Sequence, residues 1–370
     1  MINKQFENDD ILLNFISNTQ WFNFELTNFC NIRCNYCANK HLNRKGYMSL
    51  LDFQTIINKL FRHKLFLKEV IFCGYGEPFL NKSIYDMIDY IGDLGIELTI
   101  QSNGKWQLDD GRIGSLYKVN RLSVTIDGVT NEVYNLSRPN TNVNLVFDNL
   151  RKIVEYRERD GKKHPIITAK MNVFAFNKHE THDFINKCKD LKFDQICLAK
   201  GYGPPCVVTT INRAEYERYS DIELSIAETL FENEIHSSEG ECEINEDKRG
   251  LAKLIRQNPS DLFLTLGCFN TATIKWDGTL LPCCWDTYST LPLGNLVNSS
   301  LEEVLSRRNL DKKGREILNS KNDVFTEVPC VNCPYFLKYF QPGIPIKIRK
   351  LLLKLLPTKL KSLIKKVLGR

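Results

Sequence analysis

Short apolar runs alternate with longer stretches of helical spacing along this chain, from about residue 21 onward. Six runs have the length and apolar content of strands: 21–27, 68–74, 96–104, 121–128, 165–174 and 194–201. Four segments between them carry apolar residues at helical spacing: 50–63, 83–95, 144–159 and 178–192. This alternation is typical of parallel β/α units. It predicts an α/β fold, a partial (β/α)6 TIM barrel.

The pattern changes after the sixth strand, and it divides the chain into five predicted segments. These are an N-terminal extension (1–20), the barrel (21–211), a charged helical linker (212–261), a small cysteine-rich domain (262–340) and a basic amphipathic tail (341–370). Within the cysteine-rich domain we expect a hairpin over 274–282, turning at Asp277–Gly278, and a helix over 300–308.

The composition favours a globular protein of a reducing compartment. The chain has 370 residues, of which 42% are hydrophobic and 25% are charged. Thirteen cysteines without a signal peptide indicate metal-bound thiolates rather than a disulfide framework. We therefore expect a cytoplasmic location.

The net charge of +6 comes from the C-terminal end. Residues 345–370 hold nine Lys and Arg and no acid, so residues 1–344 have a net charge of −3. A mildly acidic body argues against binding to nucleic acid. The tail predicts peripheral contact with anionic lipid at the inner membrane face, because Leu360, Leu363 and Ile364 begin an apolar stripe between lysines. Packing of the tail on the protein itself is the alternative.

Three cysteines near the start are the first candidate metal ligands. Cys30, Cys34 and Cys37 lie in the run CNIRCNYC with C-x3-C-x2-C spacing. A 4Fe–4S cluster normally takes four cysteines, so three on one loop leave one iron open to another ligand. A zinc knuckle or a reactive thiol cluster is the alternative, although zinc prefers four protein ligands in structural sites.

This spacing, with the aromatic Tyr36 before the last cysteine, resembles the signature of the radical S-adenosylmethionine (SAM) superfamily. The resemblance implies that the open iron binds the amino and carboxylate groups of SAM. It also implies reductive cleavage of SAM to methionine and a 5′-deoxyadenosyl radical, with electrons from a donor such as flavodoxin or ferredoxin.

Further motifs follow the next predicted strands. The run CGYGEP at 73–78 resembles the superfamily's GGE motif, which implies that Gly74, Gly76 and Glu77 hold the SAM amino group. Ser102 and Thr125 fall where the family contacts the SAM ribose, and Arg138 matches an arginine that pairs with the SAM carboxylate in several relatives. Ordinary turns are the alternative for the regions after the third and fourth strands.

A second set of cysteines resembles the SPASM or twitch domain of radical SAM enzymes. It implies one auxiliary 4Fe–4S cluster held by four ligands: Cys268, Cys283, Cys330 and Cys333. No cysteine follows Cys333, so the ligands of a second auxiliary cluster are missing. Zinc is the alternative metal, and Cys284 is the alternative to Cys283.

The other cysteines lack ligand spacing, and we interpret them as packing or surface residues: Cys73, Cys188, Cys197, Cys206 and Cys242. A catalytic residue is not evident. Sulfatase-maturing relatives place a basic aspartate directly after the position of Cys283. This chain has Cys284 there, and its nearest acid is Asp286.

The resemblance implies an enzyme that abstracts a hydrogen atom from a substrate. A single auxiliary cluster resembles aminocyclitol dehydrogenases, and it favours oxidation of a sugar, aminocyclitol or glycan precursor. Modification of a peptide or protein is the first alternative. It is disfavoured by the short stretch of 29 residues before Cys30 and by the missing second cluster. A non-catalytic Fe–S or zinc scaffold is the second alternative.

Overall fold

The computed structural model describes residues 15, 19, 21–62, 69–200, 271–282, 286, 289 and 291–319. Several sequence predictions lie outside these residues: the linker 212–261, the tail 341–370, and the cysteines Cys268, Cys283, Cys284, Cys330 and Cys333.

A parallel sheet forms the centre of the described part, in the order β6-β5-β4-β3-β2-β1. Its strands are β1 (Trp21–Phe24), β2 (Glu69–Phe72), β3 (Glu97–Ser102), β4 (Arg121–Thr125), β5 (Ile166–Val173) and β6 (Gln195–Lys200). All five neighbouring pairs are parallel. This confirms the α/β fold and the six predicted strands, in the consecutive order that a partial barrel requires.

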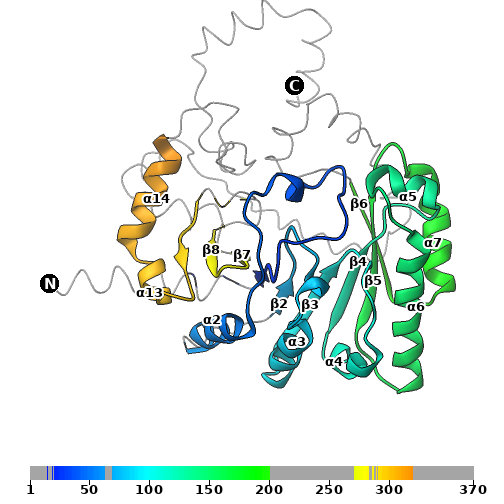
Figure 1. Cartoon of the computed structure of the whole chain (residues 1–370), viewed down its shortest axis with the longest axis horizontal. Helices are drawn as coiled ribbons and strands as arrows, with labels where there is room; N and C mark the ends of the chain where they lie inside the picture. The colour runs from blue at the N-terminus through cyan, green and yellow to red at the C-terminus, as the bar shows by residue number, and fades with distance from the viewer. Residues whose placement is uncertain are drawn as a thin grey trace, which may run out of the picture.

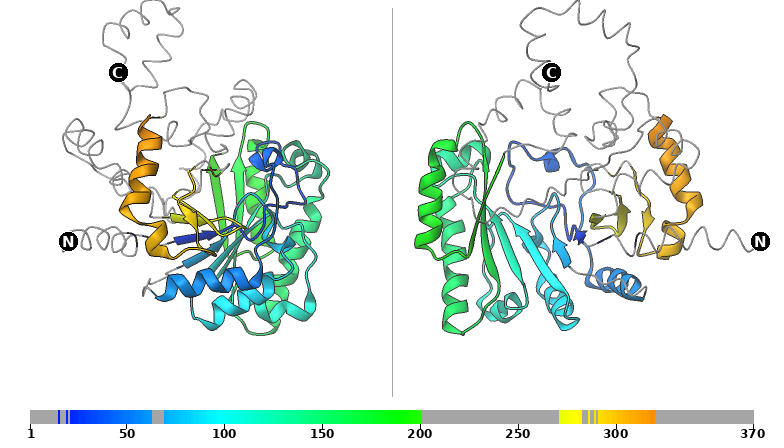
Figure 2. Two further views of the ribbon diagram at one scale, coloured as in Figure 1. Left: turned by 60° about the vertical axis from the view of Figure 1, so that its left-hand side comes forward. Right: turned by 180° about the vertical axis from the view of Figure 1, so that it is seen from behind.

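The helices between the strands lie along one face of the sheet (Figures 1 and 2). They are α2 (Leu50–Arg62), α3 (Ile84–Asp93), α4 (Ile113–Leu116), α6 (Val143–Arg159) and α7 (Thr181–Asp190). The connecting segments also hold α5 (Asn131–Ser137) and the short 3-10 turns η1 (Ala38–His41), η2 (Pro78–Leu80), η3 (Asp110–Arg112) and η4 (Lys178–Glu180). Phe53 of α2 packs edge-to-face on Phe24 and Phe72, which marks the strand face that the helices cover. None of the described helices has the length and apolar character needed to span a bilayer.

The two faces of the sheet differ in chemistry. Side chains that face the helices are apolar and fully buried, for example Phe72, Ile100 and Val124. Successive side chains of a strand point to opposite faces, so the alternate positions form an inner face away from these helices. Four residues in register cross this face from β3 to β6, and we call them the inner polar row: Gln101, Ser123, Thr168 and Gln195.

The predicted hairpin of the C-terminal part is confirmed, and it extends the same sheet. Strand β7 (Thr271–Ile274) pairs in parallel with β1, and β8 (Thr279–Leu281) and β9 (Gly294–Asn295) follow antiparallel. The turn lies at Asp277–Gly278 as predicted. Gly278 has a φ of 84°, a left-handed conformation that glycine adopts without strain.

The helix predicted over 300–308 is two helices, α13 (Leu301–Val304) and α14 (Arg307–Asn319). Ser300 and Glu303 form a capping box that starts α13. One lysine ties this part to the barrel helices. Lys59 of α2 donates from Nζ to the carbonyl oxygens of Leu296, Val297 and Ser299, at 2.7, 2.9 and 3.0 Å. These contacts and the shared sheet join the two parts of the chain.

Candidate active site

The three cysteines of the first motif lie on the loop that follows β1, where it leaves the carboxyl end of the strand. The backbone N–H of Cys37 donates to the carbonyl of Cys34 (3.1 Å), and Cys37 Sγ accepts from the N–H of Asn39 (3.4 Å). Burial, together with the neighbouring thiols of Cys34 and Cys30, raises the pKa of Cys37 to about 12. The three thiols therefore share one partly buried site.

In the part of the chain that the structure describes, no three His, Cys, Asp or Glu side chains form a group that could hold one metal ion. A four-iron cluster takes its thiolates on different irons, so its cysteines need not converge on one point.

The loop after β2 packs closely against this segment. A Cβ on Gly76 would lie 2.1 Å from the carbonyl oxygen of Thr27, so only glycine allows this approach. The N–H of Glu77 donates to the carbonyl of Phe29 (2.8 Å). The Gly74–Glu77 loop and the cysteine loop are thus in direct backbone contact, as the predicted SAM site requires.

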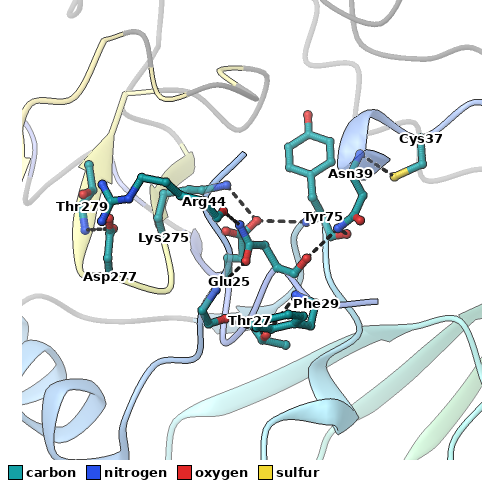
Figure 3. Close-up of polar contacts among 12 residues, drawn as sticks. Glu25, Thr27, Phe29, Cys37, Asn39, Arg44, Tyr75, Lys275, Asp277 and Thr279 are labelled. Atoms are coloured by element: carbon teal, nitrogen blue, oxygen red, sulfur yellow. Dashed lines mark hydrogen bonds and ion pairs between the residues drawn. The ribbon is translucent and has the colours of Figure 1, made fainter. Parts of the chain in front are cut away.

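Asn39 is a bridging residue that no motif or spacing in the sequence singles out. Its side-chain Nδ2 donates to the carbonyl oxygens of Asn28 (2.7 Å) and Tyr75 (2.6 Å) (Figure 3). Lys45 Nζ donates to Asn39 Oδ1 (3.0 Å). Asn39 is 8% exposed, so its amide holds the turn after Cys37 against the glycine loop.

The carboxylate of Glu77 is almost fully buried and joins the ends of β2 and β3. It accepts from the backbone N–H of Asn103 (2.8 Å) and Phe79 (3.2 Å), and from the hydroxyl of Ser102 (2.9 Å). Burial raises the pKa of Glu77 to about 7, although the donors from Asn103, Phe79 and Ser102 act to lower it. A cation beside Glu77 would stabilise its ionised form.

The hydroxyl of Ser102 forms all of its hydrogen bonds with other groups of the protein. It donates to Glu77, and it accepts from the N–H of Gly104 (3.0 Å) and from Trp106 Nε1 (2.8 Å). One donor and two acceptor sites are all that a hydroxyl offers. In this structure Ser102 therefore holds Glu77, and its predicted contact with the SAM ribose would require one of these bonds to open. Thr125 lies at the end of β4, half-buried on the inner face.

Arg138 and Tyr36 meet at a buried aspartate. Arg138 Nε lies 2.9 Å from Asp127 Oδ2, and the hydroxyl of Tyr36 donates to the same oxygen at 2.5 Å. Arg138 Nη2 also donates to the Tyr36 oxygen (2.8 Å). The aromatic residue of the cysteine motif is thus fixed by the arginine that the resemblance assigns to SAM.

Asp286 has a clear structural contact. Its side chain is 2% exposed, and Oδ2 accepts from the N–H of Leu291 (2.8 Å). Its own carbonyl accepts from the N–H of Ser289 (3.2 Å). Asp286 is therefore held by backbone contacts with Leu291 and Ser289.

Comparison with known families identifies two segments of the chain. Residues 24–186 match the radical SAM superfamily, and residues 268–334 match the SPASM iron–sulfur cluster-binding domain. The chain belongs to the radical SAM superfamily and carries an SPASM domain, as the cysteine motifs predicted. It is a radical SAM enzyme, and its cofactors are SAM and 4Fe–4S clusters.

Individual relatives are distant. A tungsten-containing aldehyde ferredoxin oxidoreductase cofactor-modifying protein of Pyrococcus furiosus is 22% identical over 275 residues, 70% of this chain and 69% of that protein. A GTP 3′,8-cyclase of Synechocystis is 28% identical over 170 residues, 44% of this chain and 49% of the cyclase.

Solved structures share the fold. Streptococcus suis SuiB bound to SAM has a TM-score of 0.56 at 16% identity, over 90% of this chain and 75% of SuiB. Tagged anSMEcpe with bound SAM has a TM-score of 0.53 at 16% identity, over 86% of this chain and 84% of that protein.

The described residues fit these cofactors. Three thiols share one loop, and a buried carboxylate with a raised pKa, Glu77, lies beside it. SAM carries an ammonium and a sulfonium, which are the charges that a desolvated carboxylate favours. Cys30, Cys34 and Cys37 would hold the cluster, and the Gly74–Glu77 loop with Arg138 would hold SAM.

Proposed function

We propose that this enzyme oxidises a small hydroxylated substrate, such as a sugar, an aminocyclitol or a glycan precursor. The observation that carries the proposal is the inner polar row, because its side chains are amides and hydroxyls. Gln101 and Gln195 are exposed although they lie on strands of the sheet. Thr168 Oγ1 donates to Gln195 Oε1 (3.0 Å), so the row already forms a hydrogen-bonded pair.

The next register toward the carboxyl ends of the strands continues this polar surface. Thr125 lies beside Lys170, and Lys170 lies beside Cys197. Amide and hydroxyl groups both donate and accept hydrogen bonds, as the hydroxyl groups of a sugar do. A face of this kind suits a polyol better than an apolar peptide side chain.

In the proposed reaction, reductively cleaved SAM supplies the 5′-deoxyadenosyl radical that takes a hydrogen atom from the substrate. The inner polar row would orient the substrate so that one C–H bond faces the cysteine loop. Oxidation of an alcohol to a carbonyl also releases a second electron and a proton. An auxiliary cluster held by the SPASM domain would accept that electron, and a flavodoxin or ferredoxin would supply the initiating electron.

The test is substrate-dependent formation of 5′-deoxyadenosine by the anaerobically reconstituted full chain. Dithionite and SAM are added with a panel of polyols and amino sugars, or with a panel of peptides. We expect polyols or amino sugars to accelerate 5′-deoxyadenosine formation and to give a ketone product. The variants Gln101→Ala and Ser123→Ala should raise KM for that substrate, whereas Glu155→Ala on the exposed side of α6 should not.

Peptide modification is the second candidate. SuiB was solved with its precursor peptide SuiA, and anSMEcpe with the Cp18Cys peptide. Both proteins share the fold of this chain. Acceleration by peptides alone would support this candidate and contradict the polyol proposal. Complete absence of 5′-deoxyadenosine under all conditions would contradict radical chemistry itself and favour a scaffold role.

A further inference from the structure

A buried ion pair joins the first strand of the barrel to the SPASM hairpin. Lys275 Nζ lies 2.7 Å from Glu25 Oε2, although the two residues are 250 positions apart in the sequence. Glu25 is 1% exposed and Lys275 is 7% exposed. Glu25 directly follows β1 and Lys275 directly follows β7, so the parallel pairing of these strands brings the two charges together.

The same carboxylate oxygen holds the glycine loop. The backbone N–H of Tyr75 donates to Glu25 Oε2 at 3.0 Å. A Cβ on Gly74 would lie 2.6 Å from Glu25 Cγ, so the loop rests directly on this side chain. Figure 3 shows Glu25 between Lys275 and Tyr75, with Asn39 and Cys37 on the other side of Tyr75.

The hydrogen bond from Tyr75 fixes the direction of the preceding carbonyl. In a trans peptide the C=O and the N–H of one unit point in opposite directions. The N–H of Tyr75 points at Glu25, so the carbonyl of Gly74 points away from Glu25. The backbone of this loop is the part that is assigned to the amino group of SAM, and Glu25 sets its orientation.

The charge of Glu25 needs compensation, because it lies out of water. A buried carboxylate without a nearby cation is strongly unfavourable and shifts toward its protonated form. Cys73 is another titratable group beside it, a thiol whose pKa is raised to about 12 by burial and by Glu25. Lys275 supplies the cation, and its Nζ also lies 5.2 Å from the centre of the Tyr75 ring.

The two carboxylate oxygens of Glu25 differ in their contacts. Glu25 Oε1 is buried and has no hydrogen-bond partner among the described residues. The contacts that offset the burial of this carboxylate are therefore those of Oε2 with Lys275 and with Tyr75. Loss of either contact leaves a buried charge with one partner.

We propose that Lys275 of the SPASM hairpin is a positioning residue for SAM: by pairing with Glu25 it holds the Gly74–Glu77 loop in the orientation that binds the cofactor. The hairpin would then contribute to the SAM site as well as leading to the auxiliary cysteines. This inference rests on the assignment of the glycine loop to SAM. It predicts that removing Lys275 alone weakens SAM binding more than replacing both charged residues together does.

The experiment is a double-mutant cycle on the reconstituted full chain, with Lys275→Met, Glu25→Gln and the double variant. The dissociation constant of SAM is measured by anaerobic titration, and the EPR spectrum of the reduced protein is recorded with and without SAM. We expect Lys275→Met to weaken SAM binding about tenfold, which corresponds to ~1.4 kcal/mol. The double variant should bind within about threefold of wild type, because a glutamine oxygen accepts from Tyr75 without needing a cation.

Lys312→Met is the matched control, because Lys312 is exposed on α14 in the same C-terminal part. It should leave the SAM affinity and the EPR spectrum unchanged. Iron content and thermal unfolding are measured for every variant. A purely structural role would lower the melting temperature of Lys275→Met without changing the SAM affinity, and that result would overturn the proposal.

Two further outcomes separate the possibilities. A double variant that binds SAM no better than Lys275→Met would show that the ion pair is not what couples hairpin and loop, which also overturns the proposal. Wild-type protein whose EPR spectrum does not respond to SAM would contradict the SAM assignment, on which the proposal rests. A tenfold loss in Lys275→Met that the second substitution reverses would support it.

Discussion

Arg138 and Asp127 form an ion pair at 2.9 Å in which the two side chains are 5% and 0% exposed. Asp127 also accepts from the hydroxyl of Tyr36, and its Oδ1 accepts from the N–H of Asn172 (3.0 Å). One carboxylate thus joins the cysteine loop to the ends of β4 and β5. The position of Tyr36 between Cys34 and Cys37 depends on this aspartate.

Removal of one partner of this pair should destabilise the protein strongly. We expect Arg138→Met to lower the free energy of unfolding by about 3–5 kcal/mol, because the Asp127 charge stays buried without its cation. Anaerobic urea denaturation measures the change. Arg151→Met is the control, since Arg151 pairs with Glu155 at an exposed site, and it should cost less than about 1 kcal/mol. Equal costs for the two variants would contradict the buried-pair interpretation.

Lys59 should be the main cross-link between α2 and the loop after β9. Its ammonium donates three hydrogen bonds, all to carbonyl oxygens of residues 296–299. We expect Lys59→Met to lower stability by about 1–3 kcal/mol, because three partly buried carbonyls lose their donor. Limited proteolysis should then cut the C-terminal part sooner. Arg62→Met, at an exposed position on the same helix, should behave as wild type; matching proteolysis rates in both variants would refute the prediction.

The auxiliary ligands can be separated by metal analysis. If both sites hold 4Fe–4S clusters, the reconstituted chain should contain about eight irons. We expect Cys283→Ala to reduce this to about four and Cys284→Ala to leave about eight. The opposite result would make Cys284 the ligand. Four irons with bound zinc in the wild-type protein would replace the auxiliary cluster with a zinc site.

The basic tail should bind anionic membranes. We propose a cytoplasmic protein with peripheral contact at the inner membrane face through residues 345–370, which hold nine cations and no acid. The full chain should float with phosphatidylserine liposomes at low salt and less at high salt, because the attraction is screened. A chain that ends at residue 344 should stay at the bottom of the gradient. Equal flotation of both chains would remove the membrane role of the tail.

Features that depend on neighbouring residues could be predicted from the sequence. The six parallel strands follow from local apolar runs, and the hairpin turn follows from Asp277–Gly278. The helix α5 was missed because its seven residues make only about two turns, too few to show a helical periodicity. Thr130 caps it, and Glu180 receives the N–H of Val129 and the hydroxyl of Thr130, a contact across 50 positions.

Polar contacts between distant segments could not be predicted from one sequence. Nothing in the local pattern pairs Glu25 with Lys275, because a hydrogen bond or ion pair leaves no periodicity in the chain. Ser102 illustrates the converse. The motif placed it correctly at the end of β3, but the structure shows its hydroxyl bonded to Glu77, Gly104 and Trp106. The spacing of a sequence motif predicts where on the fold a residue lies, and the residues around it in the folded structure determine which hydrogen bonds it forms.

The parallel pairing of β7 with β1 has a consequence for engineering this enzyme. Trp21 to Phe24 are in register with Thr271 to Ile274, so one side of the C-terminal hairpin forms its backbone hydrogen bonds with β1. A chimera that exchanges only the SPASM domain would pair β1 with a β7 strand from another protein. An exchange that preserves function should therefore move β1, β7 and Lys59 together, because these residues join the SPASM domain to the parallel sheet and to α2.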